Sequence, residues 1–260
     1  MYSDDFFLEE KWLKKIDRQT KDLIDRIGVD RKTVSEVFDK STLILFGKLI
    51  SDEIIEYLDF VISTGKEANI FRAVTPKNKF LAIKIFRTST STFKHIQKYI
   101  EGDPRFKGRY SSRREIVFEW TKKEYKNLNI LNEIKIPAPK PIFRKNNVLL
   151  MSYIGSKKEP APQLKDIQIN NPEELFDTII SYISIMFKKG GIVHADLSPY
   201  NILFFRNKPY LIDLGQGVLL EHPYALDFLR RDILNIVQFF NKFGIKKDSE
   251  KIFKKITKSS

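Results

Sequence analysis

The sequence predicts a two-lobed α+β protein in which a small antiparallel sheet precedes a mostly helical second half. Short runs of β-branched and aromatic residues, separated by turn residues, occupy residues 60–86 and 142–151. After residue 171 the apolar residues instead recur with helical spacing. Residues 156–162 lie between these parts. This polar segment has prolines at positions 160 and 162 and is typical of a boundary between lobes.

Composition and charge favour a cytoplasmic protein with an anionic partner. The 260 residues include no cysteine and three widely spaced histidines, which excludes disulfides, thiolate chemistry and a structural zinc site. Residues 1–7 are acidic where a signal peptide is basic, and the longest apolar run, residues 43–50, is too short to span a membrane. The net charge of +13 indicates nucleic acid, phosphates or a membrane surface as the partner.

A helical extension is predicted ahead of the sheet, over residues 1–59. Helical spacing of apolar residues predicts four short helices, over residues 6–28, 30–38, 43–50 and 52–58. We expect this extension to pack against the sheet that follows. A helical nucleic-acid-binding motif is the alternative.

Three antiparallel strands are predicted next, over residues 60–62, 69–74 and 80–86. The turn between the first two strands contains Ser63, Thr64, Gly65 and Lys66. Small side chains let backbone N–H groups approach phosphate oxygens, and hydroxyl groups add donors, so this turn could cover a phosphate. Most turns of this composition bind nothing, which is the alternative.

A lysine and a glutamate stand out because each falls on an apolar face. Lys84 shares one face of the third strand with Ala82, where a lysine needs an anionic partner; a lysine protecting an edge strand is the alternative. In the helix expected from about Ser112, Glu124 follows Trp120 on the apolar stripe. A buried carboxylate there needs a cation, for which Lys84 is the candidate, unless Glu124 borders the stripe and faces water.

The strongest concentration of polar side chains surrounds a predicted hairpin formed by residues 202–205 and 210–212. Asp196 and Asn201 precede its first strand, and Asp213 follows its second strand. The hairpin would bring the three side chains to one edge, where their oxygens suit Mg²⁺. The alternative is that Asp and Asn are simply common turn residues.

Taken in order, these features resemble the phosphoryl-transfer plan of protein kinases, with two departures. The phosphate loop lacks Gly-x-Gly-x-x-Gly, and no long activation segment separates Asp213-Leu214-Gly215 from the helix expected from Tyr224. The loop Ser-Thr-Gly-Lys-Glu-Ala, the string His194-Ala195-Asp196-Leu197-Ser198 and the string Ile-Asp-Leu-Gly-Gln from Ile212 resemble the first subfamily of RIO atypical kinases. The resemblance covers about residue 30 onward and is nearest to archaeal members.

This resemblance implies a two-lobed protein-kinase-like fold and a nucleotide site. Lys84 would contact the ATP phosphates and Glu124 would pair with Lys84. Backbone groups of Ser152 and Ile154 would hold the adenine, with Met151 at the back of the pocket. The implied domain limits are 60–151 for the first lobe, with an insertion over 87–114, then a hinge over 152–156 and a second lobe over 157–260.

The resemblance also implies the chemistry. Asp196 would accept the proton of the substrate hydroxyl, and Asn201 and Asp213 would bind Mg²⁺ or Mn²⁺. The protein would be a serine/threonine kinase that autophosphorylates, or mainly an ATPase in which Asp213 is itself phosphorylated, chemistry that its place among metal and phosphate allows.

The implied partner is the small ribosomal subunit during its maturation, which fits the positive charge. The insertion, rich in Ser, Thr, Lys and Arg, is expected to be mobile. Its basic residues are expected near rRNA unless they form a solvated surface: Lys94, Lys98, Arg105, Lys107, Arg109, Arg113 and Arg114. We expect no membrane contact and a monomer.

Two other functions stay open at this point. Small-molecule phosphotransferases of the aminoglycoside or choline type share the Asp, Asn and Asp core, but they usually carry His-Gly-Asp where this chain has His194-Ala195-Asp196. A non-catalytic RNA-binding assembly factor could use ATP only to change conformation.

Overall fold

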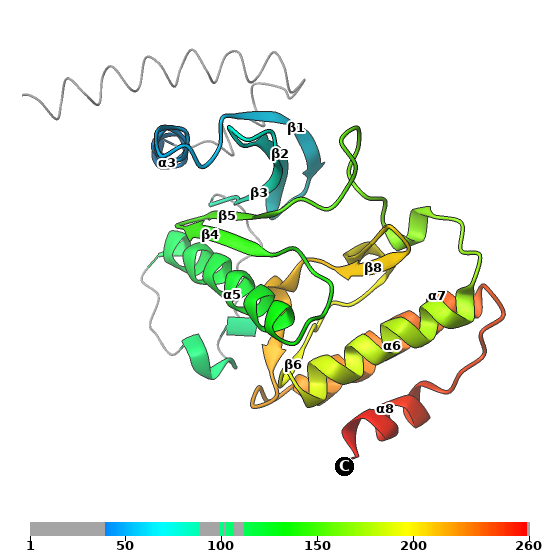
Figure 1. Cartoon of the computed structure of the whole chain (residues 1–260). Helices are drawn as coiled ribbons and strands as arrows, with labels where there is room; N and C mark the ends of the chain where they lie inside the picture. Colours follow the sequence, from blue (N-terminus) through cyan, green and yellow to red (C-terminus); the bar gives the residue numbers. More distant parts are fainter. Residues whose placement is uncertain (1–39, 89–98, 101, 107–111, 259–260) are drawn as a thin grey trace, which may run out of the picture. The chain divides into compact units, whose positions relative to one another are not determined.

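The computed structural model describes residues 40–88, 99–100, 102–106 and 112–258 (Figure 1). The chain divides into two compact units, Met1–Ser91 with Ile142–Tyr153 and Thr92–Pro141 with Ile154–Ser260. The expected limits placed residues 92–141 in the first lobe, whereas their contacts group them with the second unit. The helices expected over residues 6–28 and 30–38 lie outside the described residues.

The first unit consists of helix α3 (Lys40–Ser51) and a five-stranded sheet with the order β1-β2-β3-β5-β4. The strands are β1 (Tyr57–Thr64), β2 (Ala68–Val74), β3 (Phe80–Phe86), β4 (Pro141–Lys145) and β5 (Val148–Ser152). The pairs β1–β2, β2–β3 and β3–β5 are antiparallel. All the strands expected in this region are therefore present.

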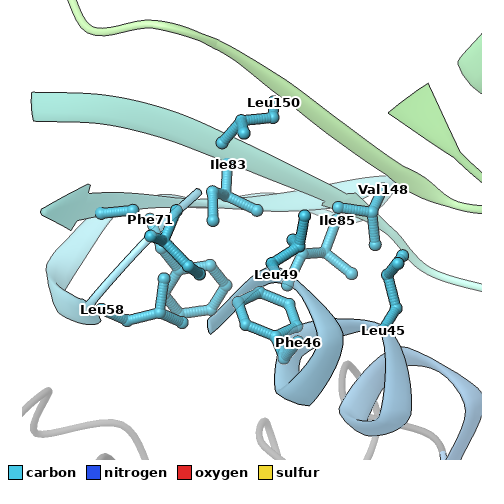
Figure 2. Packing of buried hydrophobic residues seen from close by; sticks show 11 residues of the cluster. Leu45, Phe46, Leu49, Leu58, Phe71, Ile83, Ile85, Val148 and Leu150 are labelled. Carbon is cyan, nitrogen blue, oxygen red and sulfur yellow. The ribbon is translucent and has the colours of Figure 1, made fainter. Parts of the chain in front are cut away.

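The core of the first unit lies between α3 and one face of the sheet. Figure 2 shows Phe46 and Leu49 of α3 meeting side chains of β2, β3 and β5, among them Phe71, Ile83 and Ile85. Side chains alternate along a strand, so β3 directs its isoleucines toward α3 and its even-numbered residues to the opposite face. The expectation that the helical extension packs on the sheet is confirmed for α3.

The prediction of a helix over residues 52–58 is wrong. Helix α3 ends at Ser51, and Glu53 takes a left-handed backbone conformation with φ of 54°. The N–H of Ile54 donates to the carbonyl of Leu49 (3.0 Å), which closes the helix end, and β1 begins at Tyr57. Because the few apolar side chains here can enter the core from a strand as well as from a helix, their spacing could not decide between the two.

The second unit is mostly helical, as expected. Its helices are α5 (Arg113–Glu133), α6 (Pro172–Lys188), α7 (Ala225–Asn241) and α8 (Ser249–Thr257). Helix α5 begins after Ser112, whose hydroxyl accepts a hydrogen bond from the N–H of Glu115 (3.3 Å). Among the helices of the described ranges, none is both long and apolar enough to cross a membrane.

Short strands and 3₁₀ turns fill the centre of the second unit. Strand β6 (Ile192–Val193) pairs with β9 (Val218–Leu219), and β7 (Ile202–Phe205) pairs with β8 (Lys208–Leu211). The 3₁₀ turns are η1 (Pro104–Phe106), η2 (Leu164–Asp166), η3 (Pro199–Asn201) and η4 (Leu214–Gln216). The β7–β8 turn is two residues long, Arg206 and Asn207 with φ of 50° and 58°, which is shorter than the four-residue turn expected.

Part of the insertion packs against α5 and α7. Tyr99, Ile100 and Phe106 are buried, and the ring of Tyr99 packs against Trp120 (6.1 Å between centroids) and Phe228 (5.2 Å). Their aromatic side chains account for this packing, and the mobility expected of the insertion stays a prediction. The flanking residues 89–98 and 107–111 lie outside the described ranges.

Candidate active site

Lys84 lies at the centre of the sheet in the first unit. Strand β3 runs between β2 and β5, with Lys84 opposite Ile70 on one side and Leu149 on the other, so the edge-strand alternative is wrong. The side chain is only 5% exposed, and its Nζ lies 5.0 Å from the centroid of the Phe86 ring. A buried ammonium in this setting requires electrostatic compensation.

Met151 shares the sheet face of Lys84. It lies opposite Ala82 in the β3–β5 register and is buried, and Ser152 is the last residue of β5. Ile154 begins the next segment of the chain, where its carbonyl accepts a hydrogen bond from the N–H of Ala161 (3.0 Å). Lys84, expected at the phosphates, and Met151, expected at the adenine, thus share one face of the sheet.

The expected phosphate loop spans the exposed end of β1 and the turn that follows it, since Ser63 and Thr64 are the last residues of β1 and Ala68 is the first of β2. Ser63, Thr64, Gly65 and Lys66 are all exposed. The N–H of Gly65 donates to the carbonyl of Ala68 (2.9 Å), and a Cβ at Gly65 would lie only 3.1 Å from that oxygen. The close approach of the two backbone segments favours glycine at this position.

Asp196 and Asn201 contact each other in the second unit. The Nδ2 of Asn201 donates to the backbone carbonyl of Asp196 (2.8 Å) and to its Oδ2 (3.0 Å). The carbonyl of Asn201 accepts a hydrogen bond from the N–H of Ile212 (3.0 Å), which places Asp213 beside the same turn. The β7–β8 hairpin thus gathers these polar residues at one edge.

The side-chain oxygens at this edge suit a hard divalent cation. Asp213 is exposed, and because Asn201 uses its Nδ2 on Asp196, its Oδ1 is the atom left for a ligand. Within the described ranges, no three acidic, histidine or cysteine side chains form a metal cluster. This set fits Mg²⁺, which typically takes one or two protein carboxylates and completes its shell with water and phosphate oxygens.

The loop that carries Asp196 is held by a buried aspartate of α7. Asp232 accepts hydrogen bonds from the N–H of Ala195 (2.8 Å) and the N–H of Leu197 (2.9 Å). Burial raises the pKa of Asp232 to about 7, while the two N–H donors act to lower it. Sequence reasoning missed Asp232, although a carboxylate on the apolar stripe of a helix was the available signal.

His194 connects the same loop to the segment before Asp213. Its Nε2 lies 3.0 Å from the carbonyl of Ile212, so Nε2 carries the proton. Burial lowers the pKa of His194 to about 4, which keeps the ring neutral at physiological pH. Its Nδ1 is buried and has no hydrogen-bond partner among the described residues.

Glu124 lies on α5 and is 1% exposed, so the alternative that it faces water is wrong. Burial lowers the pKa of its neighbour Lys123 to about 7, and the negative charge of Glu124 acts against this shift. The pairing of Glu124 with Lys84 joins the two units and stays a prediction.

Arg105 corrects an expectation about the insertion. Its guanidinium donates to both carboxylate oxygens of Asp103 (2.9 and 2.6 Å) and to the Oδ1 of Asn127 (2.9 Å). The side chain is therefore engaged inside the unit rather than facing an RNA partner. Arg113 and Arg114 are exposed, and the other basic residues listed above for the insertion lie outside the described residues.

Comparison with known proteins identifies the family of the chain. A family model described as RIO domain matches residues 69–252. The RIO-type serine/threonine-protein kinase Rio1 of Methanocaldococcus jannaschii is 40% identical over 98% of this chain and 86% of its own length. The protein of the same name from Thermoplasma acidophilum is 51% identical over 73% of this chain and 99% of its own. Human serine/threonine-protein kinase RIO1 is 40% identical, and the match spans 39% of its length.

The fold also agrees with solved structures. The Rio2 kinase of Chaetomium thermophilum, described as an ADP/Mg²⁺-phosphoaspartate complex, superposes with a TM-score of 0.65. The match covers 85% of this chain and 67% of that chain at 22% sequence identity. This likeness confirms the kinase-like fold. From the family model and the relatives together, the chain belongs to the RIO family of serine/threonine-protein kinases, with the Rio1 proteins that its Ser63–Ala68 loop predicted.

Proposed function

We propose that the protein is an ATP- and Mg²⁺-dependent serine kinase that autophosphorylates and can also turn over ATP. The observation that carries the proposal is the edge where Asn201 binds Asp196 and lies next to Asp213, on a loop fixed by Asp232. The curated relatives support it, since they are named serine/threonine-protein kinases. The solved neighbour with ADP and Mg²⁺ supports the nucleotide and the metal.

In this proposal Asn201 and Asp213 hold Mg²⁺ through their side-chain oxygens. The metal would neutralise charge on the phosphates and so favour the departure of ADP from the γ-phosphoryl group. The hydrogen bond from Asn201 Nδ2 holds Oδ2 of Asp196 in place. In the proposal Asn201 binds the metal and Asp196 acts on the substrate hydroxyl.

The transfer itself asks little covalent chemistry of the protein. A serine hydroxyl oxygen forms a bond to the γ-phosphorus as the bond from that phosphorus to the β–γ bridging oxygen breaks. The bridging oxygen leaves with the electron pair as part of ADP, and Asp196 accepts the hydroxyl proton. Lys84 contacts the phosphates and Glu124 holds Lys84, which gives both buried charges a partner.

The adenine would lie against the sheet face of Met151, held by backbone groups of Ser152 and Ile154. The carbonyl of Ile154 already accepts a hydrogen bond from Ala161, so its N–H is the better placed of its two backbone groups to contact the base. The exposed segment from Ser63 to Lys66, at the end of β1, would cover the phosphates.

The proposed setting is the maturation of the small ribosomal subunit in the cytoplasm, with the protein as a monomer. The net charge of +13 supports an RNA-containing partner, since counterion release favours binding of cationic surfaces to phosphates. Arg113 and Arg114, exposed at the start of α5, are the described residues of the insertion that fit this contact.

Replacing Asp196 or Lys84 tests the assignment. We expect Asp196→Ala and Lys84→Ala to lower autophosphorylation and ATP turnover by about 100-fold or more, since each removes a group that acts on the transferred phosphate or the attacking hydroxyl. Radiolabelled γ-phosphate transfer and release of inorganic phosphate measure the effect. The matched controls are Asp166→Ala and Lys79→Ala, which remove exposed side chains of the same kind. Full activity in either site variant would reject the proposal.

The chemistry of the labelled protein separates kinase from ATPase. A phosphoserine survives hydroxylamine, whereas an acyl phosphate on Asp213 is cleaved by it. We expect label that resists hydroxylamine; label that hydroxylamine removes from the wild-type protein would move the assignment to an ATPase cycle through a phosphoaspartate. Transfer to an added small metabolite instead of protein would favour the phosphotransferase alternative, although Ala195 stands where those families usually carry glycine.

A further inference from the structure

The turn that follows Asp213 rests on one face of α5. A Cβ on Gly215 would lie 2.9 Å from the indole of Trp120, and a Cβ on Gly217 would lie 2.9 Å from Nδ2 of Asn127. Both distances are too short for any side chain, so glycine at these two positions lets the helix come into contact with the turn.

Two further α5 contacts hold the carbonyls of this turn. The fully buried Nζ of Lys123 donates to the carbonyls of Gly215 (3.2 Å) and Gly217. The Nδ2 of Asn127 donates to the carbonyls of Leu214 (2.8 Å) and Gly217 (2.8 Å). Trp120, Lys123 and Asn127 are spaced by three and four residues, which places them on one side of the helix.

Asp103 and Arg105 of the insertion contact Lys123 and Asn127 of α5. The Oδ2 of Asp103 lies 3.7 Å from the Nζ of Lys123, and neither side chain is exposed. Arg105 donates to Asp103 and, through Nη1, to the Oδ1 of Asn127 (2.9 Å). The bond from Arg105 fixes the amide orientation in which Nδ2 of Asn127 faces the turn. Asp103 supplies the negative charge that a buried ammonium needs.

We infer that Lys123 and Asn127 are positioning residues for Asp213, and that residues 103–105 of the insertion keep them in place. Asp213 has φ of 62° and ψ of 57°, a left-handed conformation that must be held from both sides. Ile212 is held before it by Asn201 and His194, and Leu214 is held after it by Asn127. The inference rests on the proposed role of Asp213 as a metal ligand.

A positioning role and a purely structural role predict different results. If Lys123 acts through Asp213, its loss should weaken only the part of ATP affinity that depends on Mg²⁺. If the network only stabilises the fold, its loss should change ATP affinity equally with and without the metal, or leave it unchanged.

The experiment compares ATP affinity in Mg²⁺ with that in EDTA, measured by isothermal titration on the full chain. We expect Lys123→Met to reduce the enhancement by Mg²⁺ by about tenfold and to leave affinity in EDTA unchanged, because hydrogen bonds from a charged donor are lost. The matched control is Lys122→Met, the neighbouring partly exposed lysine that pairs with Glu119, which should keep the enhancement. In the Asp213→Asn background, Lys123→Met should cause no further loss.

Two outcomes overturn the inference alone: an undiminished Mg²⁺ enhancement in Lys123→Met, or an equal loss in both Asp213 backgrounds. If Lys123→Met does not fold, Arg105→Met at the rim of the network serves, with an expected loss of about threefold in the same ratio. An unchanged ratio in that variant equally overturns it. If Mg²⁺ does not change the ATP affinity of the wild-type protein, the proposed function itself is rejected. This result can be recognised before any variant is made.

Discussion

Ala195 and Asp213 both take left-handed backbone conformations, with φ of 65° and 62°. Such a conformation is disfavoured for alanine and persists only where surrounding contacts enforce it. At Ala195 the enforcing contacts come from α7, since Asp232 accepts from its N–H and Arg231 donates to its carbonyl. The conformation of this loop therefore depends on particular residues of α7, just as the proposed chemistry depends on particular residues of the site.

His194 makes the stability of the protein depend on pH. Its pKa is about 4 in the folded state, below the value of 6.5 for an unperturbed histidine. Between these values the unfolded chain takes up a proton that the folded protein does not, so the free energy of unfolding falls as the pH is lowered from 6.5 to 4. We expect this contribution to approach about 3 kcal/mol, measured by urea unfolding across the window.

The matched comparison is His194→Gln, which keeps a donor for the carbonyl of Ile212 but does not titrate. Asp232 titrates with the opposite sign, because its raised pKa stabilises the fold at low pH and this contribution is lost as the pH rises toward 7. The difference between wild type and variant therefore isolates His194. An identical pH dependence in the two proteins would show that the ring is not buried in its neutral form.

Single residues were predictable where chemistry and position coincided. Lys84 and Glu124 stood out as charges on apolar faces, and both are buried. Lys123 was not found, because a lysine next to a glutamate on a helix is ordinary in sequence and its partners lie elsewhere in the chain. Asp232 carried the same signal as Glu124, but its partners are backbone N–H groups, which no sequence displays.

At the scale of elements, α3 is part of the folded first unit and not an accessory. Leu49 is 1% exposed at the centre of the cluster in Figure 2. We expect Leu49→Ala to lower the free energy of unfolding by about 3 kcal/mol, through lost burial and the cavity that remains. Equilibrium urea unfolding followed by circular dichroism measures the change.

Ile44 on the same helix provides the control, because 42% of its surface is exposed. Ile44→Ala should change stability by less than about 1 kcal/mol. Equal effects of the two substitutions would contradict the packing of α3 against the sheet.

Elements with long, regular periodicity were predictable, and short apolar segments were not. Helices α5, α6, α7 and α8 and the sheet strands follow directly from spacing and turn residues. The prediction of a helix over residues 52–58 was wrong because the few apolar residues there fit the end of a helix as well as the start of a strand. The burial of Tyr99 and Phe106 was not predictable, because the composition of the insertion suggested a solvated segment and their contacts are with distant elements.

At the scale of the whole molecule, the expected site draws on both compact units. The first unit carries Lys84 and Met151 on one sheet face, and the second carries Glu124 and the edge formed by Asp196, Asn201 and Asp213. Because the chain belongs to a known family, its motifs gave the order of the site residues along the chain. No local pattern encodes how residues from two separate units would meet at one nucleotide, so that part of the prediction rests on the family resemblance.

The most direct test of the account is a crystal structure of the protein with Mg²⁺ and a non-hydrolysable ATP analogue. We predict that oxygens of Asn201 and Asp213 coordinate the metal, and that Lys84 contacts the phosphates while paired with Glu124. A triphosphate bound elsewhere, or a metal held without Asn201 and Asp213, would contradict the account.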